Sequence, residues 1–188
     1  MPWPAYPIET PRLLLRPFTS DDVDDLLAYQ SREDACRYTP RTPRSRDDVM
    51  EWLTAQRATT VLTDEGQALC LAVALRDGPL IGDVMLFYRS REHRTGEIGY
   101  VINPEFGGRG YATEACQALL PLAFDALGLH RVVARIDARN QASAALARRL
   151  GMRQEAHLRE NEWFKGEWTD EIDFAILASE WSATHASA

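Results

Sequence analysis

The chain has 188 residues, of which 45% are hydrophobic and 26% are charged, and its net charge is −7. This length suits one domain that buries roughly 70% of its unfolded surface without help from a metal or a disulfide. The acidic balance argues against general binding to nucleic acid. The longest apolar run, residues 68–75, is far shorter than the roughly 20 residues of a membrane span. No signal peptide is visible, and three cysteines without a CxxC pair fit a reducing cytosol, so we expect a cytoplasmic chain.

The first quarter of the chain predicts one strand and two helices. Residues 1–10 contain three prolines and are expected to form an extended tail, and residues 12–18 read as a strand. Thr19 and Ser45 each precede acidic residues and an apolar pattern at helical spacing. A hydroxyl followed by acids is typical of a helix start, so we expect a helix after each of them.

The middle of the chain predicts a hairpin followed by a strand–helix–strand unit. The β-rich runs 68–75 and 80–88 flank the turn sequence Arg-Asp-Gly-Pro. A third run, 97–102, is followed by apolar residues at helical spacing over 109–127 and by an alternating strand over 132–138. The strands on either side of that helix are expected to pair in parallel through a right-handed crossover.

The last quarter predicts a short helix and two strands. Asn140 is expected to cap a helix that ends before Gly151, and residues 152–160 and 171–178 read as strands, with a frayed terminus over 180–188. We therefore predict one domain over residues 1–188 of the α/β (α+β) class. It should have a mixed, mostly antiparallel sheet of about seven strands with about four helices on its faces.

A glycine-rich loop is the most informative segment. Residues 103–115, NPEFGGRGYATEA, lie between a predicted strand and the long helix. The glycines allow a tight turn, and the first helical turn then presents free N–H groups from about Arg109 to Thr113. Free amides at the positive end of a helix dipole predict an anion site. A Walker signature is absent, and Thr113 stands where a dinucleotide fingerprint requires Gly or Ala, so a nucleotide-dependent enzyme is the weaker interpretation.

Charge is distributed unevenly behind this loop. Residues 131–153 hold six arginines and one acid, and residues 155–173 hold seven acids and two bases. One interpretation is a site for an anionic ligand beside a site for a cationic one. The other is a pair of solvated faces, and both remain open at this point.

The loop resembles that of a known family. Residues 107–112, GGRGYA, are similar to the Q/R-x-x-G-x-G/A acetyl-CoA loop of the GNAT superfamily of N-acetyltransferases. The strings EIGYVINPEFGGRGYATEA and ARNQASAALARRLGM, the opening ETPRLLLRP and the closing Trp168-Thr169-Asp170 resemble the RimJ/RimL-like branch, which acetylates the N-termini of ribosomal proteins. The resemblance spans roughly residues 9–178. Gly107 replaces the usual Gln or Arg, so one side-chain contact to phosphate is lost while the backbone donors remain.

The resemblance implies a GNAT-like fold, acetyl-CoA as co-substrate, no metal and possible homodimers. It implies that Val101 and Ile102 pair with the pantetheine arm and that Arg109 to Thr113 hold the pyrophosphate. Asn140 and Ser143 would face pantetheine and the sulfur, with helix capping as the compatible alternative for Asn140. The implied cofactor-binding residues are Val101, Ile102, Gly108, Arg109, Gly110, Tyr111, Ala112, Thr113, Asn140, Ser143 and Arg149, the last either at the adenosine 3′-phosphate or on a solvated face.

Transfer of an acetyl group to an amine requires a neutral amine and a stabilised thiolate. The tyrosine that many GNAT enzymes use as the acid is matched here by Ala147, so Ser143, or a water, is our candidate for that role. Glu97 is the candidate base, against a cross-strand ion pair with an arginine. Deprotonation at pH 7 costs about 1 kcal/mol for a protein α-amine and about 4.6 kcal/mol for a lysine, so a weak base favours α-amines.

The acceptor is expected to be an amine, either a protein N-terminus or a small molecule. The candidate substrate-binding residues are Trp163, Trp168 and Asp170, which could frame a cationic acceptor or simply cover the sheet edge. The four histidines show no metal-ligand spacing, so we expect no metal. The alternative function is a non-catalytic acyl-CoA-binding or regulatory module with the same fold.

Overall fold

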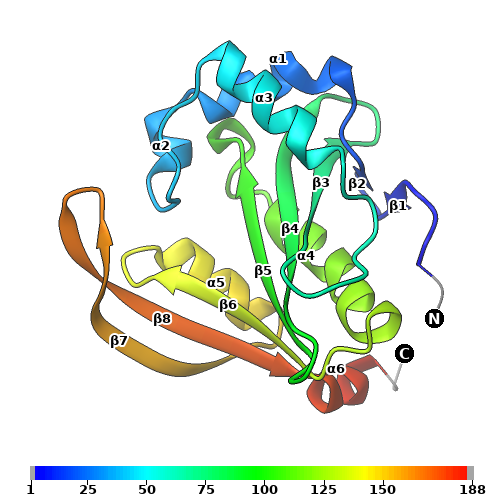
Figure 1. Cartoon of the computed structure of the whole chain (residues 1–188), viewed down its shortest axis with the longest axis vertical. Coiled ribbons are helices and arrows are strands. Elements are labelled where there is room, and N and C mark those ends of the chain that lie inside the picture. Colours follow the sequence, from blue (N-terminus) through cyan, green and yellow to red (C-terminus); the bar gives the residue numbers. More distant parts are fainter. Residues whose placement is uncertain (1–2, 186–188) are drawn as a thin grey trace.

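The computed structural model describes residues 3–185 and contains one eight-stranded sheet in the order β1-β2-β3-β4-β5-β6-β8-β7 (Figure 1). The strands are β1 (Ile8–Glu9), β2 (Leu13–Arg16), β3 (Ala68–Leu75), β4 (Leu80–Ser90), β5 (Thr95–Ile102), β6 (Arg131–Asp137), β7 (Arg153–Phe164) and β8 (Glu167–Leu177). All neighbouring strands pair antiparallel except β5 and β6, which are parallel. The predicted mixed, mostly antiparallel α/β sheet is confirmed, with one strand more than expected.

The helices lie on both faces of this sheet. They are α1 (Val23–Gln30), α2 (Glu33–Cys36), α3 (Arg46–Gln56), α4 (Tyr111–Pro121), α5 (Gln141–Arg149) and α6 (Ala178–His185). Short 3₁₀ turns cover Ser20–Asp22 and Pro104–Phe106, and a π-helical turn, Leu122–Ala126, continues α4. Between residues 3 and 185, no helix combines the length and apolarity needed to cross a membrane.

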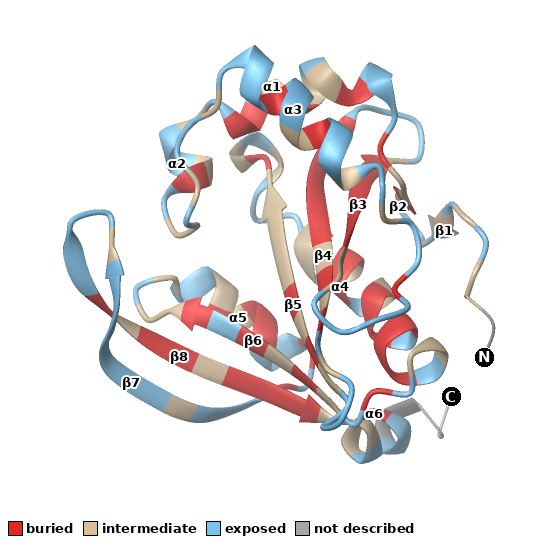
Figure 2. Cartoon of the chain, viewed as in Figure 1, coloured by how far each residue is buried: buried red, intermediate tan, exposed pale blue. Residues whose placement is uncertain are grey.

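Two apolar clusters fix the layers. The larger one places α4, α5 and α6 against one face of the sheet, through residues such as Leu119 and Leu146. The smaller one places α1 and α3 against the other face of β3 and β4, through Leu26 and Leu53. As a result β3 and β4 are buried on both sides, whereas β7 is exposed over most of its length (Figure 2).

The central strand–helix–strand unit carries the main opening in the sheet. The hydrogen-bonded register between β5 and β6 covers only residues 95–97 against residues 131–133. Beyond that point the two strands diverge, while β5 remains paired with β4 and β6 with β8 (Figure 1). The backbone edge of β5 from Ile98 to Ile102 therefore has no strand partner on the β6 side within the described residues.

Several boundaries differ from the sequence prediction. The strands expected over 152–160 and 171–178 are one long hairpin, β7–β8, that turns at Lys165 and Gly166. Residues 161–170, the outer half of this hairpin, were not predicted as strand. Charged residues dominate this part, and the β7 strand buries almost none of its side chains. The prediction of a frayed segment from residue 180 is wrong up to residue 185, because α6 occupies it, and residues 186–188 lie outside the described part.

A buried carboxylate ties α1 to β4. Asp83 is fully buried, accepts a 2.6 Å hydrogen bond from the Tyr29 hydroxyl, and lies 3.9 Å from the Arg41 guanidinium. A buried charge needs such donors, because water no longer solvates it.

Tyr29→Phe should therefore lower the free energy of unfolding by about 1.5–3 kcal/mol, the typical value of a hydrogen bond to a charged group. Urea denaturation followed by circular dichroism measures this loss. Tyr6→Phe is the control, since the half-buried Tyr6 hydroxyl donates to the Thr60 carbonyl and accepts from Trp3 Nε1 but bonds no charged group. Equal stability of wild type and Tyr29→Phe would contradict the importance of this bond.

Candidate active site

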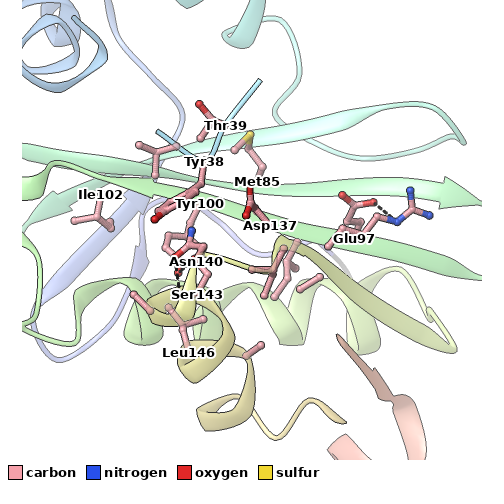
Figure 3. A pocket seen from close by; sticks show the side chains of 18 of the residues that line it. Tyr38, Thr39, Met85, Glu97, Tyr100, Ile102, Asp137, Asn140, Ser143 and Leu146 are labelled. Carbon is pink, nitrogen blue, oxygen red and sulfur yellow. Dashed lines mark hydrogen bonds and ion pairs between the residues drawn. The ribbon is translucent and has the colours of Figure 1, made fainter. Parts of the chain in front are cut away.

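A cavity of about 580 Å³ occupies the gap between β5 and β6 (Figure 3). One wall is β5 from Glu97 to Ile102, and the opposite wall is β6 from Ala134 to Asp137 with the inner face of α5. Residues between α1 and α3, including Tyr38 and Arg41, line the side away from α5. The cavity therefore passes through the sheet and opens toward both faces.

The glycine loop adopts the geometry that the sequence predicts for an anion site. Gly108 and Gly110 have φ values of +73° and +81°, a region that glycine adopts without strain. Gly110 is the N-cap of α4, which begins at Tyr111 rather than at the predicted residue 109. Within the described chain, the backbone N–H groups from Gly108 to Thr113 donate to no protein acceptor.

An ion-pair cluster holds this loop against the N-terminal segment. The Glu114 carboxylate accepts hydrogen bonds from the Thr10 hydroxyl at 2.6 Å, from the Arg12 backbone N–H at 2.9 Å and from Arg12 Nε at 2.6 Å. Arg12 Nη1 also donates to the Arg109 carbonyl at 2.9 Å, and its guanidinium stacks on the Tyr111 ring. The loop is thereby preorganised without its own amides being used.

Arg149 lies beside the first turn of α4. It sits in the last turn of α5, and its Nε donates to the Thr113 hydroxyl at 3.3 Å. The structure therefore brings Arg149 next to the predicted phosphate loop, although the two are 36 residues apart. A guanidinium at this place adds positive charge to the same anion site.

The start of α5 positions two predicted residues. Asn140 caps the helix, since its side-chain oxygen accepts from the Ser143 backbone N–H at 3.1 Å. The Ser143 hydroxyl then lies 2.8 Å from the hydroxyl of Tyr100 on β5, and all three residues line the cavity (Figure 3). Ala147, one turn further along α5, also lines the cavity and offers no hydroxyl. Sequence analysis missed Tyr100, because an aromatic residue in a strand usually indicates only packing.

Glu97 stands at the point where β5 and β6 separate, and it lines the cavity. Its carboxylate accepts from Arg89 Nε on β4 at 2.9 Å and lies 4.0 Å from Arg135 Nε on β6. The cross-strand ion pair, which sequence analysis gave as the alternative to a role of Glu97 as the base, is thus present. A carboxylate held between two guanidinium groups can still accept a hydrogen bond from an amine or a water, so the two roles are compatible.

The cavity contains further residues that sequence analysis did not select. Tyr38 and Asp137 line it (Figure 3), and so does Arg41. Hydrogen bonding from the Arg139 side chain lowers the pKa of Asp137, so this carboxyl is ionised at neutral pH. No sequence motif marks these positions, because they come from two segments that lie far apart in the chain, the one between α2 and α3 and the end of β6. Among the described residues, no group of three or more His, Cys, Asp and Glu side chains is placed to hold a metal.

Trp163, Trp168 and Asp170 do not line this cavity. The two tryptophans form an edge-to-face pair 5.4 Å apart near the tip of the β7–β8 hairpin and are 62% and 58% exposed. Asp170 is engaged by the Glu160 backbone N–H and by His157, which both lower its pKa. The structure thus places these three residues on the β7–β8 hairpin and outside the lining of the cavity, and their role in substrate binding stays a prediction.

The hairpin tip nevertheless reaches the opposite side of the molecule. Lys165 Nζ donates to the carbonyl of Cys36, the last residue of α2, at 2.6 Å. Since α2 leads into the segment that lines the cavity, this contact connects the tip of the hairpin to that segment.

Comparison with known proteins identifies the family. Residues 12–153 match the family described as "Acetyltransferase (GNAT) domain", and the chain belongs to it. YnaD of Bacillus subtilis (strain 168), an uncharacterized N-acetyltransferase, is 31% identical over 175 residues, which is 93% of this chain and 99% of YnaD. Spermidine N(1)-acetyltransferase of Escherichia coli (strain K12) is 28% identical over 109 residues, 58% of this chain and 59% of that one.

A solved structure gives the same result. The crystal structure of a GNAT-family acetyltransferase from Bacillus anthracis superposes with a TM-score of 0.82 at 30% identity, covering 91% of this chain and 98% of the other. The protein is thus an N-acetyltransferase with the GNAT fold, as the sequence resemblance implied. Members of this family use acetyl-CoA as the acetyl donor.

The Glu114 cluster generates a pH prediction. Burial alone would raise the pKa of Glu114, but the hydrogen bonds from Thr10 and Arg12 outweigh it and lower the pKa below its usual 4.5. A lowered pKa stabilises the fold above the unfolded-state value, and this stability is lost as the pH falls through the folded-state pKa. Glu114→Gln should therefore lower the melting temperature at pH 7, and the difference from wild type should shrink below about pH 4.5.

Thermal unfolding at a series of pH values measures this effect. Glu9→Gln is the control, because Glu9 forms only an exposed ion pair with Arg76, and such pairs contribute little. A difference between wild type and Glu114→Gln that stays constant down to pH 3 would contradict the assigned role of the carboxylate.

Proposed function

We propose that this N-acetyltransferase binds acetyl-CoA between β5 and β6 and transfers the acetyl group directly to a primary amine. The observation that carries the proposal is the unpaired edge of β5, which leads from the free amides of the glycine loop into the cavity. An extended pantetheine arm could pair with Val101 and Ile102 as an added strand does. Amides from Gly108 to Thr113 would then bind the pyrophosphate, with Arg109 and Arg149 adding charge.

Three residues in the wall of the cavity have a defined role in this proposal. Acetyl-CoA supplies an acetyl thioester that an amine can attack. Asn140 orients the first turn of α5, and Ser143 presents its hydroxyl to the sulfur end of the donor. Glu97, held beside Arg89 and Arg135, accepts the proton of the incoming ammonium, directly or through a water.

The acceptor side supports a primary amine of low basicity. No strong base lies among the residues assigned to the reaction, and a protein α-amine near pKa 8 loses its proton far more easily than a lysine near 10.4. This supports a protein N-terminus, as the resemblance to the RimJ/RimL-like branch implies. A small-molecule amine is the other candidate, because the Escherichia coli relative is named for acetylation of spermidine.

Gly110→Asp tests the donor site. A carboxylate at the N-cap of α4 would repel the pyrophosphate, so acetyl-CoA affinity should fall at least about 100-fold, or about 2.7 kcal/mol. Isothermal titration calorimetry measures the affinity. Gly110→Asn is the matched control, because asparagine has the same shape, tolerates a positive φ and carries no charge. Equal loss in both variants would show that backbone strain, not charge, is responsible, and unchanged affinity in Gly110→Asp would refute the loop assignment.

Ser143→Ala tests the catalytic assignment. Turnover should fall at least about 10-fold while the Kd for acetyl-CoA changes less than about twofold, because the hydroxyl acts on the departing sulfur rather than on the bound donor. Release of free thiol during incubation with a panel of peptides and small amines measures turnover, and the mass shift of the product identifies the acceptor. Wild-type protein that binds acetyl-CoA but releases no thiol with any amine would favour the non-catalytic module instead.

A further inference from the structure

Two hydroxyl groups meet across the gap in the sheet. Tyr100 projects from β5 and Ser143 from the first turn of α5, and their oxygens lie 2.8 Å apart in the wall of the cavity (Figure 3). This hydrogen bond links the two sides of the opening at a level where β5 and β6 are no longer paired. The proposed transfer itself gives no role to Tyr100.

The Ser143 hydroxyl behaves differently from other hydroxyls on the helices of this protein. A serine or threonine in a helix tends to donate its hydrogen to the carbonyl four residues earlier. Ser31, Thr54 and Ser182 do so, with distances of 2.7, 2.9 and 2.8 Å to the carbonyls of Leu27, Met50 and Ala178. The Ser143 hydroxyl is instead hydrogen-bonded to Tyr100, so its hydrogen need not be donated to the helix backbone.

The direction of the Tyr100–Ser143 bond follows from the chemistry of the two groups. A phenol is more acidic than an aliphatic alcohol, so it is the better donor, and the serine oxygen is the better acceptor. Burial raises the pKa of Tyr100 to about 12, with the hydrogen bond to Ser143 acting in the opposite direction. The phenol therefore keeps its hydrogen at neutral pH and is available as the donor to Ser143.

We propose that Tyr100 is a positioning residue that holds the Ser143 oxygen as an acceptor and thereby directs the Ser143 hydrogen toward the sulfur of the departing CoA. This inference rests on the proposed acetyl transfer. In that reaction the amine nitrogen bonds to the carbonyl carbon, the carbon–sulfur bond breaks, and its electron pair stays on sulfur. The proton of the amine goes to Glu97 or solvent, and Ser143 keeps its proton while donating a hydrogen bond to the thiolate.

Stabilisation by a hydrogen bond fits the energetics better than complete proton transfer. A thiol of cysteine type ionises near pH 8.5, well below the raised pKa of Tyr100, so the thiolate would not take the proton of the phenol. The Ser143 hydroxyl, as a fixed donor aimed at the developing negative charge, needs no such transfer. This explains how α5 can present Ala147 where many relatives of its family place a tyrosine.

The ionisation of bound CoA tests the proposal without any acceptor amine. The thiolate absorbs in the ultraviolet, so the difference in absorbance between the CoA and desulfo-CoA complexes, followed against pH, gives the pKa of the bound thiol. In wild type it should lie about one unit below that of free CoA, because a donated hydrogen bond favours the charged form. Tyr100→Phe and Ser143→Ala should each remove most of this shift, and both should still bind CoA.

Tyr6→Phe is the matched control, since it also removes one phenolic hydroxyl but lies outside the cavity. It should leave the thiol pKa unchanged. An unchanged thiol pKa in Tyr100→Phe would overturn the inference while leaving the proposed function intact. Failure of the wild-type protein to bind CoA at all would overturn the proposed function and the inference with it.

Kinetics provide the second measurement. Tyr100→Phe should lower kcat about 10-fold with little change in the KM for acetyl-CoA, the loss expected for one hydrogen bond in the transition state. Because Tyr100 acts only through Ser143, the double variant Tyr100→Phe/Ser143→Ala should be no slower than Ser143→Ala alone. Losses that multiply in the double variant would show that Tyr100 acts independently of Ser143 and would overturn the assignment.

Discussion

The separation of two parallel strands is the constraint on which the site depends. β5 and β6 share only three register positions, and each then stays with its outer neighbour. Backbone groups of a central strand are normally satisfied on both edges, so an unpaired edge inside a sheet is costly unless a ligand or water pairs with it. The opening therefore offers the unpaired backbone donors and acceptors of β5 to an extended molecule. Side chains from β5, β6 and α5 line the opening and need only define where such a molecule begins and ends.

The two ends of the opening are supported in different ways. At the glycine loop the support is electrostatic: Arg12 and Glu114 fix the loop from outside, so the amides of α4 remain free for an anion. At the point of separation, Glu97 is held by arginines from both flanking strands. Both ends thus use ion pairs that also fix the loop or the strands. The Arg12–Glu114 pair lies outside the cavity and leaves the loop amides free, whereas Arg89, Glu97 and Arg135 pair within the cavity wall and leave the backbone edge of β5 unpaired.

Sequence analysis succeeded where a pattern is local and failed where the fold joins distant segments. The β-rich runs of β3 and β4, the helical period before Gly128 and the N-x-x-S spacing of Asn140 and Ser143 are all local, and the structure confirms the elements that they predict. The Tyr100–Ser143 contact joins residues 43 positions apart, so no spacing could reveal it. The outer half of the β7–β8 hairpin carries charged and aromatic residues on exposed strands and therefore lacks the apolar alternation that predicts a strand.

The uneven charge along the sequence is resolved by the topology. Residues 131–153 and 155–173 come together in β6, β7 and β8, and their opposite charges pair: Arg131 and Arg153 bind Glu155, and Arg139 binds Glu167. Most of the excess basic charge is therefore used in ion pairs of the sheet, which argues against a broad anionic-ligand surface there. Arg149 is not part of these pairs and faces Thr113 at the start of α4. The charge pattern thus supports a phosphate-binding role for this one arginine, since the topology leaves it beside the free amides of the loop.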